Sequence, residues 1–337
     1  MEREGGAAAA ARGGTAAAGL VTVEAPARLH FGMFDLRGDL GRRFGGMGAA
    51  VPTPSLLLEA EPARTLEASG PDAERVLEAA RRVLAHHALP ADRAGARFVV
   101  RRALPAHAGL GSGTQLALAT ARAIAELHGL PTHVTALARA AGRARRSAIG
   151  TWLFESGGFV VEGGRREGSE APAPLLARLE IPPRWRCVLA VPRGAAGVSG
   201  DAEASAFARL PAPPAREVER VAHLVLMQLL PALADGELAP FGAALTEVQR
   251  VTGRWFAGEQ GGAFAPGASV ALVERMLAWG AAGVGQSSWG PAVYGIVDGD
   301  AAAHALADRV RGAAPGADVH VTPFSSTGAR VVAHAAG

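Results

Sequence analysis

A glycine-rich loop that leads into a helix is the part of this 337-residue chain whose residue types most directly suggest chemistry. Gly109, Gly111 and Gly113 alternate with small or apolar residues, and an apolar-periodic segment follows to about Leu127. Glycine lets the backbone turn its amides toward a ligand, and a helix start offers free amides and a positive dipole end to an anion. The loop therefore predicts a phosphate or pyrophosphate site. The residues that we expect to contact the anion are Pro105, His107, Gly109, Leu110, Gly111, Ser112, Gly113, Thr114 and Gln115.

The same loop also permits a simpler interpretation. The chain contains 44 glycines, and glycine strings often serve only as turns. The loop is not a Walker A motif, because no lysine follows it. It is a poor dinucleotide fingerprint, because no acidic residue ends a second strand about 20 residues later. Alternating apolar residues before the loop, such as Phe98 and Val100, and a helical pattern after it favour the anion site.

Three further segments carry candidate functional side chains. Arg28, His30 and Asp35 lie in a predicted strand and turn, where they either face solvent or converge on a charged substrate. Segment 142–151 places three arginines beside a glycine, as in a solvated helix end or a phosphate clamp. Segment 283–291 surrounds one tryptophan with small hydrogen-bond donors. From it we expect Gln286, Ser287, Ser288 and Trp289 to bind substrate.

The composition excludes several classes of protein. All 34 basic residues are arginine, so neither a lysine Schiff base nor a lysine phosphate clamp exists. The net charge is only +3 and aromatic residues make up 5%, without the basic stripe that nucleic-acid binding requires. The chain contains no run of 18 apolar residues, so its sequence predicts no membrane span. The single cysteine, Cys187, excludes an internal disulfide and indicates a buried thiol in a reducing cytoplasm.

The periodicity of the chain predicts an α+β protein with two domains, 20–165 and 184–335, after a disordered extension, 1–19. The stretch 163–183, rich in Gly, Pro and charge, is the predicted boundary, and 35–48 is a predicted loop. Strands are expected at 20–25, 29–33, 55–60, 98–102, 159–162, 188–191, 292–297 and 318–321. Helices are expected at 72–86, 115–127, 134–144, 216–233, 237–251, 269–279 and 301–311.

Four strings in this order resemble a known family. RLHFGMFDL, PAHAGLGSGTQLALA, GRARRSAIGTWLFESGGF and GQSSWGP are similar to motifs of the β-ribofuranosylaminobenzene 5′-phosphate synthase family of the GHMP kinase superfamily. The resemblance extends from about Val21 to the C-terminal end. It implies a mixed α/β N-terminal domain, a ferredoxin-like α+β C-terminal domain and a homodimer. It also implies condensation of 5-phosphoribosyl 1-pyrophosphate with 4-aminobenzoate or 4-hydroxybenzoate, releasing CO2 and pyrophosphate, on the pathway to methanopterin-type one-carbon carriers.

This chemistry suggests roles for individual residues. Arg28, Arg145 and Arg146 are expected to clamp phosphate or carboxylate groups, and His30 either polarises the para substituent of the aromatic acid or only packs. Asp35 and Glu155 are expected ligands of Mg2+, which prefers hard oxygen donors.

One string departs from the pattern of GHMP kinases and so helps to distinguish a kinase from the synthase. The string Ser147–Gly150 lacks the aspartate that GHMP kinases commonly carry in a Ser-Gly-Ile-Asp string. A small-molecule kinase of the same superfamily remains an alternative, because positioning and charge stabilisation dominate phosphoryl transfer. A non-enzymatic binder of phosphorylated ligands is the third hypothesis.

Overall fold

The computed structural model describes residues 18–90, 94–194, 197 and 200–335. The predicted extension therefore lies outside the described residues except for its last two positions. Those two, Ala18 and Gly19, are not an extension, because they begin the first strand, β1 (Ala18–Asp35). Within the described residues, no helix is both long and apolar enough to cross a membrane.

A long antiparallel hairpin of β1 and β2 (Arg42–Pro62) forms the centre of the first sheet. The two strands predicted within β1 are one continuous strand with irregular register near Pro26 and His30. The prediction of a loop at 35–48 is wrong except for a short turn between the strands, since β2 begins at Arg42. Its glycines serve close packing: a Cβ at Gly48 would lie 2.3 Å from the Leu29 carbonyl oxygen.

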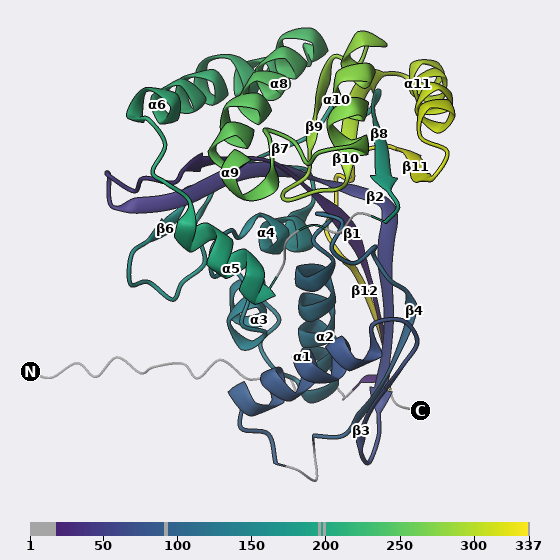
Figure 1. Ribbon diagram of the computed structural model, residues 1–337. Helices are drawn as coiled ribbons and strands as arrows, with labels where there is room; N and C mark the ends of the chain where they lie inside the picture. Colours follow the sequence, from purple (N-terminus) through teal and green to yellow (C-terminus); the bar gives the residue numbers. More distant parts are fainter. Residues whose placement is uncertain (1–17, 91–93, 195–196, 198–199, 336–337) are drawn as a thin grey trace, which may run out of the picture.

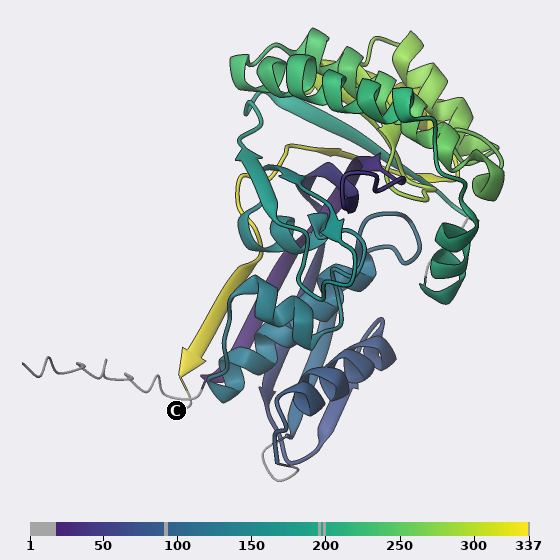
Figure 2. The ribbon, with the colours of Figure 1, turned by 90° about the vertical axis from the view of Figure 1, so that its left-hand side faces the viewer.

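The first sheet has eight strands, with the order β12-β1-β2-β4-β3 along its main path. Strand β3 pairs parallel to β4, while β12 runs antiparallel beside β1 (Figure 2). Strands β5, β6 and β7 extend the sheet from the turn end of the hairpin. Their bounds are β3 Leu66–Ser69, β4 Ala96–Arg102, β5 Phe159–Glu162, β6 Arg165–Arg166, β7 Leu175–Leu179 and β12 Arg330–Ala335.

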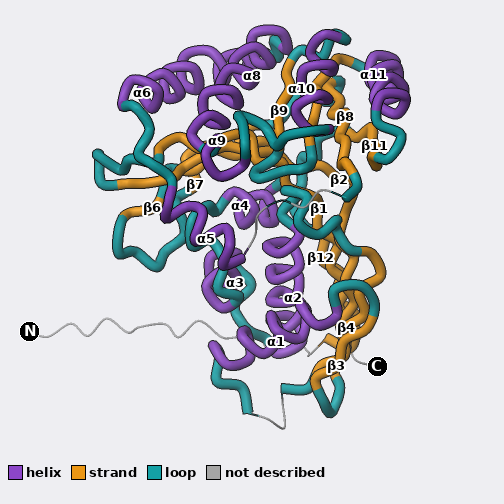
Figure 3. The backbone as a smooth tube through the Cα atoms, in the orientation of Figure 1, coloured by secondary structure: helices purple, strands orange, loops and turns teal. Residues whose placement is uncertain are grey.

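Four helices cover this sheet: α1 (Ala73–His86), α2 (Ser112–His128), α3 (Val134–Ala140) and α4 (Ile149–Ser156) (Figures 1 and 3). Helix α2 lies in the middle, against β1, β2 and α1, so most of its circumference is apolar and buried. Glycines in left-handed conformations bound it, Gly111 with φ 76° and Gly129 with φ 63°. Helix α4 was not expected from the sequence.

The second sheet has the order β11-β8-β10-β9 and is antiparallel throughout. Its strands are β8 Trp185–Pro192, β9 Gly283–Gln286, β10 Val293–Asp298 and β11 Ala317–Thr322. The accompanying helices are α5 Gly200–Arg209, α6 Ala215–Leu224, the π-helical turn η1 Val225–Leu229, α7 Leu230–Asp235, α8 Leu238–Trp255, α9 Ala257–Gln260, α10 Ala268–Ala278 and α11 Asp300–Ala313. Cys187 is buried in β8, as expected, and burial raises the pKa of its thiol.

Apolar packing joins the two sheets. Phe31 of β1 contacts Tyr294 of β10, with ring centroids 4.9 Å apart, and both side chains are fully buried. Segment 163–183 contains β7, which pairs with β5, and β12 of the predicted second domain completes the first sheet. The predicted domain limits remain a prediction, while the described halves share one apolar core.

Candidate active site

A cavity of about 270 Å³ lies where the two sheets meet. Strand β1, the turn before α4, helices α5 and α8, the segment around α9 and the β9–β10 loop all contribute side chains to it. The predicted residues that line it are Arg28, His30, Thr114, Arg145, Arg146, Gln286, Ser288 and Trp289. Three segments that the sequence singled out separately, together with the helix start at Thr114, therefore surround one cavity.

The Ser287 hydroxyl ties the glycine loop to this cavity. Ser287 Oγ donates to the Gly109 carbonyl oxygen at 2.7 Å and accepts from the His30 amide at 2.9 Å. Gly109 has φ 79°, and a Cβ there would lie 2.0 Å from the Ser287 carbonyl oxygen. Only glycine fits at this position, because a side chain would be strained and would also collide with the neighbouring backbone.

The start of α2 retains free amides. The Thr114 and Gln115 amides both donate to the Gly111 carbonyl oxygen. Within the described part of the chain, the Ser112 and Gly113 amides make no hydrogen bond, as expected for the first residues of a helix.

Other predicted loop residues hold the structure or lie outside the cavity. Gln115 is buried and its Nε2 donates to the Gly150 carbonyl oxygen at 2.9 Å, while Leu110 is buried in the core. Pro105 and the exposed His107 do not line the cavity.

Arg28 brings a largely buried guanidinium to the cavity. Its Nη1 donates to the Gly109 carbonyl oxygen at 3.2 Å, and its buried Nε has no partner. Burial lowers its pKa, while the charges of Glu203 and Glu162 act in the opposite direction. No carboxylate among the described residues forms an ion pair with Arg28, so its remaining donors are available to an anionic ligand.

His30 is a neutral hydrogen-bond donor. Its side chain is only 7% exposed, and burial, followed by the charge of Arg28, lowers its pKa to about 3. The Gly32 amide donates to His30 Nδ1 at 3.4 Å. This hydrogen bond assigns the proton of the neutral ring to Nε2.

Arg146 is held by a carboxylate and an aromatic ring. Its Nη2 lies 2.6 Å from Glu203 Oε2, and its guanidinium carbon lies 5.0 Å from the ring centroid of Phe207. The Trp289 indole N–H donates to the other oxygen of Glu203 at 3.2 Å. Phe207, Phe256 and Trp289 contact one another edge to face, with centroids 5.0 to 5.7 Å apart. We call these three rings the aromatic wall.

Several lining residues were not expected from the sequence, above all Phe207 and Phe256 of the aromatic wall and the glutamines Gln249 and Gln260. Gln249 Oε1 of α8 accepts from the Gln286 amide at 2.9 Å. Gln286 Nε2 in turn donates to Gln260 Oε1 at 3.3 Å. One feature of the sequence could have indicated Gln249: it is a polar residue on the buried face of a predicted helix, where residues are usually apolar.

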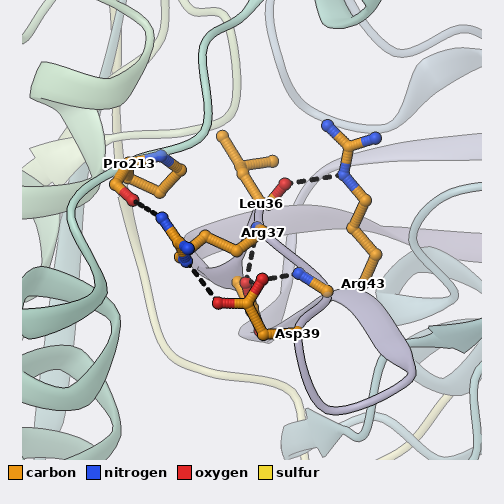
Figure 4. Close-up of polar contacts among 7 residues, drawn as sticks. Leu36, Arg37, Asp39, Arg43 and Pro213 are labelled. Atoms are coloured by element: carbon orange, nitrogen blue, oxygen red, sulfur yellow. Dashed lines mark hydrogen bonds and ion pairs between the residues drawn. The ribbon is translucent and has the colours of Figure 1, made fainter.

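The two carboxylates expected to bind magnesium do not meet at the cavity. Asp35 Oδ1 accepts from the amides of Arg37 and Gly38, and so stabilises the turn between β1 and β2. Figure 4 shows this turn, where Arg37 also donates to the Pro213 carbonyl oxygen at 2.9 Å. Glu155 is exposed on α4. The described residues contain no cluster of three or more His, Cys, Asp or Glu that fits a metal ion, so magnesium remains a prediction.

Glu162 is a fully buried carboxyl group behind the cavity. One oxygen accepts from the Ala148 amide at 2.5 Å and the other has no partner. Burial raises its pKa from 4.5 to about 7, against the opposing effects of the Ala148 amide, the Ser147 hydroxyl and Arg28. Between pH 4.5 and pH 7 the Glu162 carboxyl group is therefore protonated to a greater extent in the folded chain than in the unfolded chain.

We therefore expect Glu162 to make folding less favourable as the pH rises from 4.5 to above 7. At ~1.4 kcal/mol per pKa unit, the loss is about 3 kcal/mol. Denaturant unfolding at pH 5 and pH 8 should show that Glu162→Gln lacks this loss, because the amide does not ionise. Equal changes of stability with pH in the two proteins would contradict the expectation.

Comparison with known proteins defines the class. Residues 74–152 match the GHMP kinases N terminal domain, and residues 229–316 match the GHMP kinases C terminal domain. The fold is similar to that of homoserine kinase from Cytophaga hutchinsonii, with a TM-score of 0.64 and 19% identity over 93% of this chain and 98% of that chain. The expected GHMP kinase fold, with mixed helices and strands in both halves, is confirmed.

The sequence relatives define the family. The chain is 37% identical to beta-ribofuranosylphenol 5'-phosphate synthase of Methanothermobacter thermautotrophicus, over 82% of this chain and 88% of that protein. It is 34% identical to the Archaeoglobus fulgidus protein of the same name, over 84% and 89%. The chain belongs to this family and is an enzyme of the pentosyltransferase type, which confirms the resemblance found in its sequence.

Proposed function

We propose that this enzyme condenses 5-phosphoribosyl 1-pyrophosphate with a para-substituted benzoate to give a β-ribofuranosyl-aryl 5′-phosphate, CO2 and pyrophosphate, in the biosynthesis of methanopterin-type carriers. The observation that carries the proposal is one cavity whose lining contains both arginines and the aromatic wall. The name of the relatives specifies a ribofuranosylphenol, which favours 4-hydroxybenzoate over 4-aminobenzoate.

The charges of the cavity suit an oligoanionic donor. Among the described residues, four arginines line it, Arg28, Arg143, Arg145 and Arg146, against the single carboxylate of Glu203. Arg146 is already paired with that carboxylate, so the other three provide the surplus positive charge. Guanidinium groups bind phosphate oxygens bidentately and keep their charge when buried.

The aromatic wall suits the second substrate. Edge-to-face and stacked contacts would hold a benzoate ring against Phe207, Phe256 and Trp289. The neutral His30 offers its Nε2 proton to the para oxygen, which allows that oxygen to carry negative charge and to donate electron density to the ring. In this arrangement the sugar phosphates and the ring occupy adjacent parts of one cavity.

The reaction balances without an added oxidant or reductant. The bond between ribose C1 and the pyrophosphate oxygen breaks, and pyrophosphate leaves with the electron pair. The ring carbon that bears the carboxylate forms the new bond to C1. The bond to the carboxylate then breaks, its electrons restore the aromatic ring, and CO2 departs. Arg28 stabilises the negative charge that develops on the leaving group.

Product analysis tests the proposal directly. The purified chain is incubated with 5-phosphoribosyl 1-pyrophosphate, Mg2+ and equal amounts of 4-hydroxybenzoate and 4-aminobenzoate. We expect equimolar pyrophosphate, CO2 and aryl riboside phosphate, with the mass of the product identifying the acid used. Absence of all three products with folded protein would overturn the proposal.

A kinase is disfavoured by the first turn of α4. Gly150 occupies the position of the kinase aspartate, and a Cβ there would lie 3.0 Å from Thr114 Cγ2. Its carbonyl oxygen is also used by Gln115. Formation of ADP from ATP with a sugar or amino alcohol would support the kinase, and ligand binding without any turnover would support the non-enzymatic binder.

The aromatic wall leads to a second prediction, for Phe256→Leu. We expect the variant to raise KM for the aromatic acid about 3- to 10-fold, because edge-to-face contacts are worth roughly 0.5–1.5 kcal/mol. KM for the sugar donor should change little. The control is Phe324→Leu, since Phe324 is half-buried and does not line the cavity. An equal effect on both substrates would exclude a specific contact with the ring.

A further inference from the structure

A second, smaller niche lies beside the main cavity, between α1 and the start of α2. It has a volume of about 40 Å³, and its polar lining consists of Arg75, Arg82, Arg143 and the carboxylate of Glu78, together with Gly113. Arg143 lines both the niche and the main cavity. The niche is therefore directly adjacent to the proposed binding site of the sugar donor.

The arginines of the niche crowd around two glycines. A Cβ at Gly113 would lie 3.0 Å from Arg75 Nη2 and 3.8 Å from Arg143 Nη1. A Cβ at Gly142 would lie 3.1 Å from Arg82 Nη1 and 3.7 Å from Arg145 Nη2. The Gly113 amide makes no hydrogen bond to any described residue, so it is available as a further donor beside these side chains.

Positive charge here exceeds the negative charge that faces it. Asp72 pairs with Arg75 at 3.1 Å and Glu78 pairs with Arg82 at 2.9 Å. Arg143 forms no ion pair within the described residues, and its buried Nε has no hydrogen-bond partner. Burial first, and then the charges of Arg82, Arg75 and Arg145, lower the pKa of Arg143, whereas Glu78 opposes them. An anionic group would satisfy this imbalance.

We propose that this niche binds one phosphoryl group of the sugar donor, with Arg75 and Arg143 as its ligands and the Gly113 amide as a third donor. The inference rests on the proposed function and deepens it, because it divides the donor between two places. The ribose and its reacting carbon lie in the main cavity near the aromatic wall. One of the donor's two phosphorylated ends reaches over Gly113 into the niche.

Calorimetric titration with inorganic pyrophosphate and, separately, with ribose 5-phosphate tests the proposal and distinguishes the two ends. We compare the full chain with Arg75→Gln and with Arg81→Gln, an arginine exposed on the same helix that does not line the niche. Loss of one charge-assisted hydrogen bond weakens binding about 10- to 100-fold. We expect that loss in Arg75→Gln and unchanged binding in Arg81→Gln.

Each outcome has a definite meaning. Weaker pyrophosphate binding alone places the diphosphate end in the niche, and weaker ribose 5-phosphate binding alone places the 5′-phosphate there. Wild-type affinity of Arg75→Gln for both ligands overturns the proposal. Arg143→Gln is a second variant. If it does not fold because Arg143 is more buried than Arg75, the result for Arg75→Gln alone decides the question. If the Arg75 effect is found while no riboside phosphate is formed, the niche stands and the proposed reaction fails.

Discussion

Gly109→Ala should unfold at lower denaturant concentration than the wild type and should lose nearly all activity. The new Cβ would lie 2.0 Å from the Ser287 carbonyl oxygen, which is backbone and cannot move aside as a flexible side chain would. Steric overlap of this kind and a positive φ each cost roughly 1–3 kcal/mol, so we expect a loss of about 3 kcal/mol or more. Relief of the overlap would separate the glycine loop from the β9–β10 loop, and both carry proposed substrate contacts.

Gly129→Ala is the matched control for this prediction. Gly129 also has a positive φ, 63°, but a Cβ at this position would have no neighbouring atom within 4 Å. The control therefore introduces backbone strain without steric overlap, and it lies at the far end of α2 from the cavity. We expect a loss of roughly 1 kcal/mol with activity retained. Equal losses of stability and activity in the two variants would show that the contact with Ser287 is unimportant.

Arg28→Met should lower kcat/KM by about 100- to 1,000-fold, the usual effect of removing one preorganised donor to developing negative charge. Methionine keeps much of the apolar length of the side chain and removes the guanidinium. Only one hydrogen bond within the described protein uses that guanidinium, the contact with the Gly109 carbonyl oxygen. Most of its donors are therefore free for the substrate, so the effect should fall on catalysis.

The control is Arg101→Met, at an exposed arginine of β4 that pairs with Glu59. It should retain full activity, because surface ion pairs contribute little. Steady-state kinetics at several donor concentrations measure both variants, and thermal unfolding checks that both are folded. Arg28→Met with wild-type kcat/KM would exclude Arg28 from both substrate binding and transition-state stabilisation.

Much of the fold could be predicted from periodicity. Strand β5 begins and ends where it was expected, at Phe159 and Glu162, because four consecutive buried residues are bounded by glycine on both sides. The loop at 35–48 was misread because glycine has two uses that look alike in a sequence. At Gly46 and Gly48 it permits close approach of neighbouring backbone within a strand rather than a turn.

The candidate site was predictable where residues form local motifs and not where they meet only in space. Arg28 and Trp289 belong to recognisable strings, and the fold brings both to the cavity. Phe207 and Phe256 belong to no motif, and in a sequence each is indistinguishable from an ordinary residue of an apolar face. Glu203 pairs with Arg146 across 57 positions, a contact that depends on how α5 lies against the turn before α4. Such pairings follow from tertiary packing rather than from local propensity.

The hydrogen bonds of the Ser287 hydroxyl make the active site dependent on the folding of the whole chain. The hydroxyl joins the β9–β10 loop to His30, 257 positions earlier in the chain, and to Gly109, 178 positions earlier, so neither half of the chain carries a functional pocket by itself. Contacts between such distant positions form only when the intervening chain is folded, because the entropy of closing long loops opposes them. Catalytic competence should consequently vanish in the same denaturant step as the bulk structure, with no truncated or half-melted species retaining turnover.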